Sequence, residues 1–272
     1  MSNVLEAINE NDVSDKLSEF LNTEKTTSEI GKIGKLQSTI SGTIHTKQAA
    51  QLIQGAVIKN SKTEESEKKF KAIGLYNFSV KCRVMEDAIK KDDPYADAAF
   101  YHMHELIIRE RQILKEQIST FRNWLSGEIP KTLSLTEAMN LQPLQLDFKF
   151  NSTLAFQVLY YILDLDEHFR LIKLAQHISL VDPSQSNKTI HDGMRKARNI
   201  MNQINFYKHT DGTRKDVLDD NQRAKKAASA MPQLHLDDNF ILGKLRSALA
   251  PMIPTRPESA SGVTEEDNSK VA

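Results

Sequence analysis

The 272-residue sequence predicts a mainly α-helical protein with a short β-ribbon, in which a ribbon-helix-helix-like element is embedded in a larger helical domain. Three features predict this class: a switch from strand to helix periodicity near residue 46, a long helix that begins at residue 94, and a very apolar helix after residue 152. We expect four regions: an acidic, loosely attached arm at 1–31, the ribbon-helix-helix-like element at 32–91, the helical domain at 92–250 with one short strand near 144–150, and a disordered tail at 251–272.

The stretch "GKLQSTISGTIHTKQAAQLIQG" at residues 34–55 carries the change of period. Small and apolar side chains first alternate with polar ones, which is the pattern of a strand with one polar face. The polar positions are Gln37, Thr39, Ser41, Thr43 and His45. Thr46 has the residue type of an N-cap, and the apolar positions that follow it at helical spacing are Ala49, Leu52, Ile53 and Val57. The stretch therefore predicts a strand that runs directly into a helix.

A second helix is predicted after a polar turn. Ser61 is followed three residues later by Glu64, the pattern of a capping box, and the helix would turn Phe70 and Ile73 inward. Strand, helix, helix is the order of the ribbon-helix-helix unit. Two copies of such a unit pair their strands antiparallel, and the resulting ribbon can enter the major groove of DNA.

The predicted strand needs a partner, because its backbone groups would otherwise be left unpaired. Two partners satisfy this need. One is the same strand of a second copy, which would make the protein a dimer. The other is the strand of this chain predicted at 144–150, where the alternating apolar residues are Leu144, Leu146, Phe148 and Phe150. The pattern alone leaves both open.

The remaining helices have clear sequence signals. Asp93 and Pro94 in "DDPYAD" predict the N-cap and first residue of a helix that runs to about Leu125. The most hydrophobic helix follows at "STLAFQVLYYILDLDEHFRLIKLAQHISL" and should form the core. Further helices are expected at 189–207, 214–230 and 239–249.

Charge is balanced overall, with 36 basic and 36 acidic residues, but it is unevenly distributed. Residues 32–91 hold twelve basic and five acidic side chains, and residues 170–226 hold twelve basic and six acidic ones. Such segments can bind a polyanion or can be solvated helix faces. A secondary basic patch that could hold phosphates comprises Arg214, Lys215, Arg223, Lys225 and Lys226.

No combination of residues predicts catalysis, a metal site or a cofactor. His102 and His104 lie two positions apart, whereas helical ligand pairs are three or four apart. Asp164 and His168 could form an acid–base pair, but no nucleophile or glycine-rich phosphate loop accompanies them, so a local stabilising pair is the simpler interpretation. No apolar run approaches the roughly 18 residues of a membrane span, and the N-terminus lacks a signal peptide, so we expect a cytoplasmic protein.

Four segments give the chain a resemblance to a known family. They are "GKLQSTISGTIHTKQAAQLIQG", "AIGLYNF" with "KKDDPYADAAF", "GTRKDVLDDNQRAKKAASAMPQL" and "LRSALAPMIP", and together they cover most of residues 32–254. The chain resembles the AcaB-type transcriptional activators of conjugative plasmids and their relatives on integrating conjugative elements. The resemblance implies DNA binding through a ribbon-helix-helix element and activation of transfer genes.

The expected function is thus that of a dimeric, non-enzymatic regulator of conjugative transfer that binds double-stranded promoter DNA, with RNA polymerase as a further expected partner. In that role residues 32–91 would bind DNA and dimerise. The outer residues of the strand, Gln37, Thr39, Ser41, Thr43 and His45, would contact bases, and the phosphate contacts would be Lys35, Lys47, Lys59 and Lys62. The alternative is a structural or interaction protein of the transfer apparatus, in which the strand pairs internally.

Overall fold

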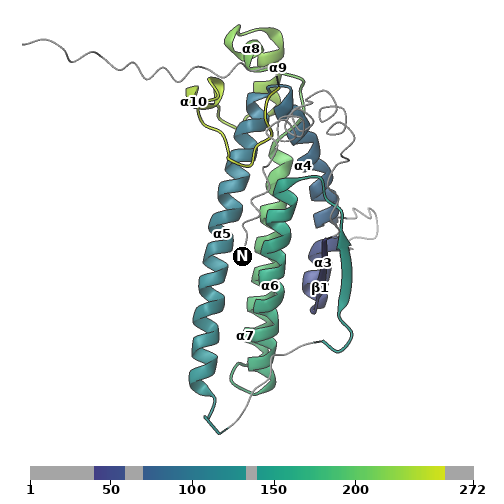
Figure 1. Ribbon diagram of the computed structural model, residues 1–272, viewed down its shortest axis with the longest axis vertical. Helices are drawn as coiled ribbons and strands as arrows, with labels where there is room; N and C mark the ends of the chain where they lie inside the picture. The colour runs from purple at the N-terminus through teal and green to yellow at the C-terminus, as the bar shows by residue number, and fades with distance from the viewer. Residues whose placement is uncertain (1–39, 59–69, 133–139, 255–272) are drawn as a thin grey trace, which may run out of the picture. The chain divides into compact units, whose positions relative to one another are not determined.

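The computed structural model describes residues 40–58, 70–132 and 140–254, and from Ser41 onwards the chain forms one compact unit (Figure 1). Its elements follow the order β1 (Ile40–Ile44), α3 (Lys47–Gln54), β2 (Ala56–Ile58), β3 (Phe70–Ala72), α4 (Leu75–Lys90), α5 (Pro94–Glu128), β4 (Leu144–Phe148), α6 (Thr153–His177), α7 (Pro183–Asn202), the 3-10 helix η1 (Gln203–Phe206), α8 (Arg214–Leu218), α9 (Gln222–Ala230) and α10 (Asp238–Ile241). The mainly helical class with a short ribbon is confirmed. No described helix combines the length and apolar character that crossing a membrane requires.

Helix α6 is the centre of the core. It packs against α3, α4, α5 and α7, and the long helices run side by side in Figure 1. Its buried residues lie on several faces, among them Leu154, Val158, Tyr161, Ile162, Phe169 and Ile172. Helix α5 is buried on all sides over its first residues, 94–100, and beyond them it buries one stripe, which includes Met103, Ile107, Leu114, Ile118 and Leu125. A helix that is apolar on more than one face needs neighbours on more than one side, so the predicted core helix is confirmed.

Helix starts follow the predicted capping signals where these are strong. Asp93 accepts hydrogen bonds from the backbone of Tyr95 and Ala96, with Pro94 at the first helical position. Helix α7 has the same Asp-Pro arrangement and begins at Pro183, because the Asp182 carboxylate accepts from the backbone of Gln185. The predicted start at 189 was therefore wrong: the "VDP" sequence opens the helix as well as ending the one before it.

The order strand, helix, helix was wrong after α3. Gly55 has φ +81° and ends α3, so Val57 lies in β2 rather than in the helix. Strand β2 pairs antiparallel with β3, placing Ile58 opposite Phe70, so Phe70 belongs to a strand and not to the predicted helix. The Ser61 and Glu64 capping box lies outside the described residues. Two strands thus separate α3 from α4, which begins at Leu75.

The C-terminal helices are shorter than predicted. The expected helix at 214–230 is divided into α8 and α9, because Asp220 adopts φ +45° and Asn221 caps a new helix. The expected helix at 239–249 is limited to α10. Residues 251–254, at the start of the predicted tail, are described, and Ile253 is buried among them. The predicted arm at 1–31 and the rest of the tail lie outside the described residues, and the division at residue 91 stays a prediction.

Candidate nucleic-acid interface

Strand β1 pairs with β4 of the same chain. The sequence left the partner open, and the structure places it within the chain. The argument for a dimer from an unpaired strand is therefore removed. The two-stranded sheet that the pair forms, β1–β4, is called the ribbon below.

The inner face of the ribbon is fixed on the core. Ile44 and Phe148 are each 2% exposed. A Cβ atom on Gly42 would lie 2.8 Å from Cε2 of Phe148, so glycine lets the ring approach the β1 backbone. Ile40 alternates with the polar positions and so belongs to the inner face, yet it is 38% exposed. Burial is therefore concentrated at the end of β1 that leads into α3.

The outer face of the ribbon is polar. Ser41 and Thr43 on β1 are exposed, as the alternation predicted, and Gln145 and Asp147 on β4 are exposed as well. The two β4 residues were not among the predicted contacts, although the alternation in "LQLDFKF" places them opposite the apolar positions. Gln37 and Thr39, the other predicted base contacts on the strand, lie outside the described residues.

A buried carboxylate of α6 holds the end of the ribbon. Asp166 is 3% exposed and accepts hydrogen bonds from the backbone N–H of His45 at 3.1 Å and from that of Thr46 at 2.8 Å. The Thr46 hydroxyl also donates to Asp166 at 2.6 Å and accepts from the backbone of Ala49, confirming the predicted N-cap. Asp166 thus fixes the strand-to-helix junction against the core helix.

The neighbours of Asp166 in "LDLDEHFR" also make structural contacts. Asp164 accepts a hydrogen bond from Arg111 at 2.6 Å, and Glu167 pairs with Arg122. His168 stacks on Phe121, with ring centroids 6.1 Å apart. The Asp164 carboxylate is therefore engaged by a cation of α5.

His45 is less available than the other predicted base contacts. Its side chain is half-buried, and its Nδ1 accepts a hydrogen bond from the backbone N–H of Asn140 at 3.2 Å. The side chain of Asn140 donates to the His45 carbonyl at 3.2 Å. Since Nδ1 is already an acceptor within the chain, this nitrogen is not free to contact a base.

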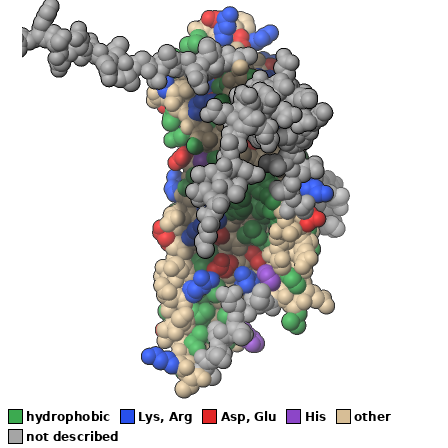
Figure 2. Space-filling view, in the orientation of Figure 1, with side chains coloured by type: hydrophobic (Ala, Val, Ile, Leu, Met, Phe, Trp, Pro, Cys, Tyr) green, Lys and Arg blue, Asp and Glu red, His purple; other side chains and the backbone are tan. Residues whose placement is uncertain are grey.

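Exposed cations flank the ribbon. Lys47 begins α3 and Lys149 directly follows β4, and both are exposed. Lys173 of α6 donates from Nζ to the side chain of Gln48 at 3.1 Å, which places a third cation beside α3. Lys35, Lys59 and Lys62 lie outside the described residues. On the face drawn in Figure 2, basic and acidic side chains among the described residues are interspersed.

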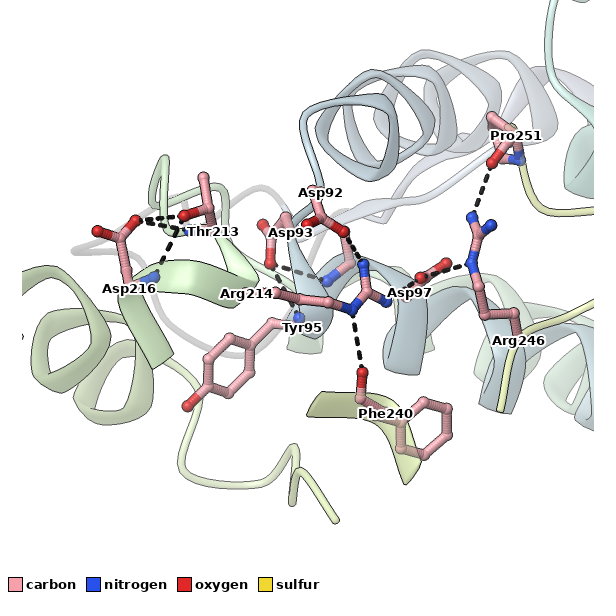
Figure 3. Close-up of polar contacts among 11 residues, drawn as sticks. Asp92, Asp93, Tyr95, Asp97, Thr213, Arg214, Asp216, Phe240, Arg246 and Pro251 are labelled. Atoms are coloured by element: carbon pink, nitrogen blue, oxygen red, sulfur yellow. Dashed lines mark hydrogen bonds and ion pairs between the residues drawn. The ribbon is translucent and has the colours of Figure 1, made fainter. Parts of the chain in front are cut away.

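Arg214 was wrongly assigned to the secondary basic patch. Its side chain is buried, forms ion pairs with Asp92 and Asp97, and donates from Nε to the Phe240 carbonyl at 3.1 Å (Figure 3). A buried guanidinium needs carboxylate partners, and "DDPYAD" supplies them. The other members of the patch, Lys215, Arg223, Lys225 and Lys226, are exposed, and Lys225 pairs with Asp220 at 3.2 Å.

Distant segments meet at this buried arginine. Asp97 also pairs with Arg246 Nε at 2.8 Å, and Arg246 donates to the Pro251 carbonyl at 2.7 Å (Figure 3). Asp93 accepts a hydrogen bond from the Tyr207 hydroxyl at 2.9 Å, and burial raises the pKa of its carboxyl. "DDPYAD", "GTRKD" and "LRSALAPMIP" therefore converge in one network at the start of α5, called the motif network below.

His102 and His104, whose spacing argued against a metal site, make separate structural contacts. The His102 ring lies 5.4 Å from that of Phe240, while His104 Nδ1 shares a 3.0 Å hydrogen bond with the Ser247 hydroxyl. Within the described ranges, no group of three His, Cys, Asp or Glu side chains is arranged to hold a metal ion.

The model of the family described as transcriptional regulator AcaB matches residues 32–254. The chain belongs to this family. The matched range contains the ribbon and the whole motif network, so the family's region of similarity includes the candidate interface. No curated protein matches the chain. A solved structure, selenomethionine-containing AcaB from uropathogenic E. coli, is similar at 12% identity with a TM-score of 0.46, covering 78% of this chain and 97% of that one.

Within this family assignment, the motifs that carry the resemblance divide into two kinds. The motif network has a structural role, because its charged side chains are paired with each other and connect distant segments of the chain. The segment that includes β1 exposes Ser41, Thr43 and Lys47. The second kind leaves polar groups of the ribbon available to a partner.

Proposed function

We propose that this family member is a non-catalytic regulator that binds double-stranded promoter DNA in a sequence-specific manner through the outer face of the ribbon. The observation that carries the proposal is the exposure of polar side chains on both strands, Ser41 and Thr43 on β1 and Gln145 and Asp147 on β4. A two-stranded ribbon is one of the elements that fit the major groove. The ribbon is formed by one chain, which is one of the two pairings that the sequence left open.

The exposed side chains match the chemistry of base edges. Glutamine pairs with adenine through two hydrogen bonds, a carboxylate accepts from the cytosine amino group, and hydroxyls bind either kind of edge. Gln145, Asp147 and the two hydroxyls of β1 take these roles, with Gln37 and Thr39 preceding them in sequence. Lys47, Lys149 and Lys173 bind phosphates, together with Lys35, Lys59 and Lys62.

The biological setting follows from the resemblance to activators of conjugative plasmids. We propose that the target is a promoter of transfer genes on a plasmid or integrating conjugative element, that the protein acts in the cytoplasm as an activator, and that it contacts RNA polymerase. A homodimer that binds two half-sites also belongs to this proposal, since twofold symmetric operators are read by symmetric pairs.

The second candidate is a non-enzymatic interaction protein of the transfer apparatus. The observation in its favour is the pairing of β1 with β4, since that candidate requires an internally paired strand. Pairing alone does not separate the two, because it leaves the polar face exposed. Membership of a transcriptional regulator family favours the first.

The first test targets base recognition. A DNA site is selected from a random duplex library by the wild-type protein, and affinity for this site and for a scrambled duplex is measured by fluorescence anisotropy. Ser41→Ala with Thr43→Ala should weaken binding to the selected site by about 1–3 kcal/mol per lost contact and leave the scrambled duplex unaffected. The matched control is Ser119→Ala with Thr120→Ala, both exposed on α5. If no site is selected, or if both pairs bind it like wild type, the ribbon does not read DNA.

The second test targets phosphate binding. Lys47→Gln should weaken binding to both duplexes and lower the salt slope by about one, because one fewer counterion is released. Lys188→Gln, exposed on α7, is the charge-matched control. Equal effects of the two variants would contradict a phosphate contact at Lys47.

A further inference from the structure

A cleft lies between α5, α6 and α7, and none of the residues that line it belongs to the proposed DNA interface. Its volume is about 790 Å³. This volume lies within the range of about 300–1,000 Å³ that is typical of small-molecule sites, and clefts between the helices of a bundle are common places for such sites. The size and position of the cleft therefore suit a small ligand.

Helix α6 forms the floor of the cleft. Both α5 and α7 pack on α6, and three side chains of α6 that are no more than 2% exposed line the cleft, Tyr161, Leu165 and Phe169. Gly193 of α7 borders the same side chains, because a Cβ atom there would lie 2.9 Å from Cε1 of Phe169. The floor is thus apolar and closely packed, and its side chains are held in place before a ligand binds.

Large apolar side chains of α5 form one wall. Phe121 and Trp124 line the cleft with ring centroids 5.2 Å apart, and Ile113 and Leu114 line it nearer the start of the helix. Trp124 is 38% exposed, although burial of a ring of this size would be favourable. Contiguous apolar surface that a fold leaves open is a common mark of a ligand-binding groove. The wall and the floor together therefore favour an apolar, aromatic occupant.

The charged side chains that line the cleft offer no free counter-charge to a ligand. Lys196 pairs with Glu110 at 2.5 Å, and Asp192 pairs with Arg195 at 3.0 Å. Glu116, the remaining lining carboxylate, is exposed to solvent. A charged ligand would lose water on entering the cleft without gaining an unpaired opposite charge inside it, and burying an uncompensated charge is costly. The charges therefore favour a neutral ligand of the same shape over an anion or a cation.

The other polar side chains that line the cleft are uncharged. Gln117 and Thr120 are exposed on α5, and Thr189 is exposed on α7. Burial lowers the pKa of the His168 imidazole, so this ring is neutral near pH 7. An amide or a hydroxyl can hydrogen-bond a carbonyl or hydroxyl group of a ligand. The exposed edge of the cleft can thus hold one polar, uncharged group.

We propose that this cleft binds a small, neutral aromatic molecule with a carbonyl or hydroxyl group. Its rings lie against Phe121 and Trp124 over the floor of α6, and its polar group lies at the exposed edge with Gln117 and Thr120. The site does not depend on the proposed DNA interface, so the two proposals succeed or fail separately.

The test compares three probes that share the naphthalene ring system and differ in charge: 2-acetylnaphthalene, 2-naphthoate and 2-naphthamidine. Equilibrium dialysis against the full chain gives the affinity and the stoichiometry of each probe. We expect the neutral 2-acetylnaphthalene to bind one site per chain at least about tenfold more tightly than either charged probe. It should also change the emission of Trp124, the single tryptophan of the sequence. Equal affinity of neutral and charged probes, or no saturable binding of 2-acetylnaphthalene at about 0.3 mM, overturns the proposal.

Two exposed apolar residues of α5 locate the probe. Trp124→Ser removes part of the wall and should weaken 2-acetylnaphthalene binding about tenfold. Ile108→Ser is the matched control, because Ile108 is 46% exposed on the same helix and does not line the cleft, so binding should stay as in wild type. Both side chains are exposed, so we expect both variants to fold. Equal binding by the two variants overturns the site.

Light scattering tests whether a second copy of the chain, and not a small molecule, fills the cleft. We expect wild type and Trp124→Ser to have the same mass in solution at equal protein concentration. A wild-type dimer that Trp124→Ser converts to a monomer would make the cleft an interface between copies and overturn the small-molecule proposal.

Discussion

The Thr46 hydroxyl donates a 2.6 Å hydrogen bond to the carboxylate of Asp166, which lies 120 residues later in the chain. The same hydroxyl accepts from the backbone of Ala49, so one side chain both starts α3 and ties it to α6. Through this contact the orientation of the ribbon is set by the most buried helix of the core. The contact links the exposed face that we propose to bind DNA to the stability of the whole fold.

Asp166→Leu should therefore destabilise the protein. The substitution removes the acceptor of three hydrogen bonds and leaves buried donors at the junction, which costs about 1–3 kcal/mol for each unsatisfied group. The free energy of unfolding is measured by urea titration. Asp192→Leu, which removes an exposed pair with Arg195, is the control and should change the free energy by less than about 1 kcal/mol. Equal losses of unfolding free energy in the two variants would show that the hydrogen bonds to Asp166 contribute little to stability.

Arg214→Met should cost stability rather than DNA affinity. It leaves Asp97, which is fully buried, with one fewer cation, and breaking a buried pair costs about 3–5 kcal/mol. Arg223→Met removes the same charge from an exposed residue and should lower the free energy of unfolding by less than about 0.5 kcal/mol. Denaturant titration gives the stability of both variants, and fluorescence anisotropy gives their DNA affinity. Together the two measurements decide between a structural role and a phosphate contact. A stable Arg214→Met protein that binds DNA weakly would restore the original assignment to the basic patch.

Gly42→Ala should destabilise the ribbon, because the added Cβ would lie 2.8 Å from the Phe148 ring. We expect a loss of about 1–3 kcal/mol, typical of overpacking. Adding Phe148→Leu to Gly42→Ala should cost less than the sum of the two single changes, because the smaller side chain makes room for the methyl group. Additive losses in thermal unfolding would mean that the two residues do not press on each other.

Gln145→Ala should weaken binding to the selected DNA site by about 1–3 kcal/mol while preserving stability, because this residue is exposed on β4. This result is specific to a ribbon formed by one chain, since a ribbon of two β1 strands would leave β4 out of the groove. The control is Gln112→Ala on α5. Wild-type affinity of Gln145→Ala would limit base contacts to β1 and the residues before it.

Glu86→Gln should change how stability depends on pH. Burial raises the pKa of Glu86 above its ordinary value of 4.5, outweighing the hydrogen bonds that it accepts from Ser152 and Thr153. The folded state then binds the proton more tightly than the unfolded state, so this group favours folding fully at low pH and loses that contribution as pH rises from 4.5 through the raised pKa. Over that interval the variant should lose less stability than wild type.

Asp87 provides a control of opposite sign. A hydrogen bond from Lys90 lowers its pKa, so its contribution is present above the ordinary value of 3.8 and is lost as pH falls. Asp87→Asn should therefore remove stability near neutral pH that wild type retains. Urea titrations of both variants between pH 3 and 8 check the two slopes, and parallel curves would contradict the shift at Glu86.

The sequence by itself determined the features that depend on neighbouring residues. Thr46 and Asp93 were identified as N-caps because the backbone N–H groups that they satisfy lie two or three residues away. The polar face of β1 was equally local, since Ser41 and Thr43 follow from alternation alone. The mainly helical class could be predicted for the same reason.

The tertiary structure decided what depends on distant partners. Whether β1 pairs with β4 or with a second copy, and whether Arg214 is buried or exposed, depends on residues more than 100 positions away, which a local pattern does not encode. The residues next to Arg214 in the sequence would suit an exposed cation equally well. Only the position of Asp92 and Asp97 at the start of α5 makes its burial favourable. Phe70 shows the same limit, because its place in a strand requires Ile58 opposite it.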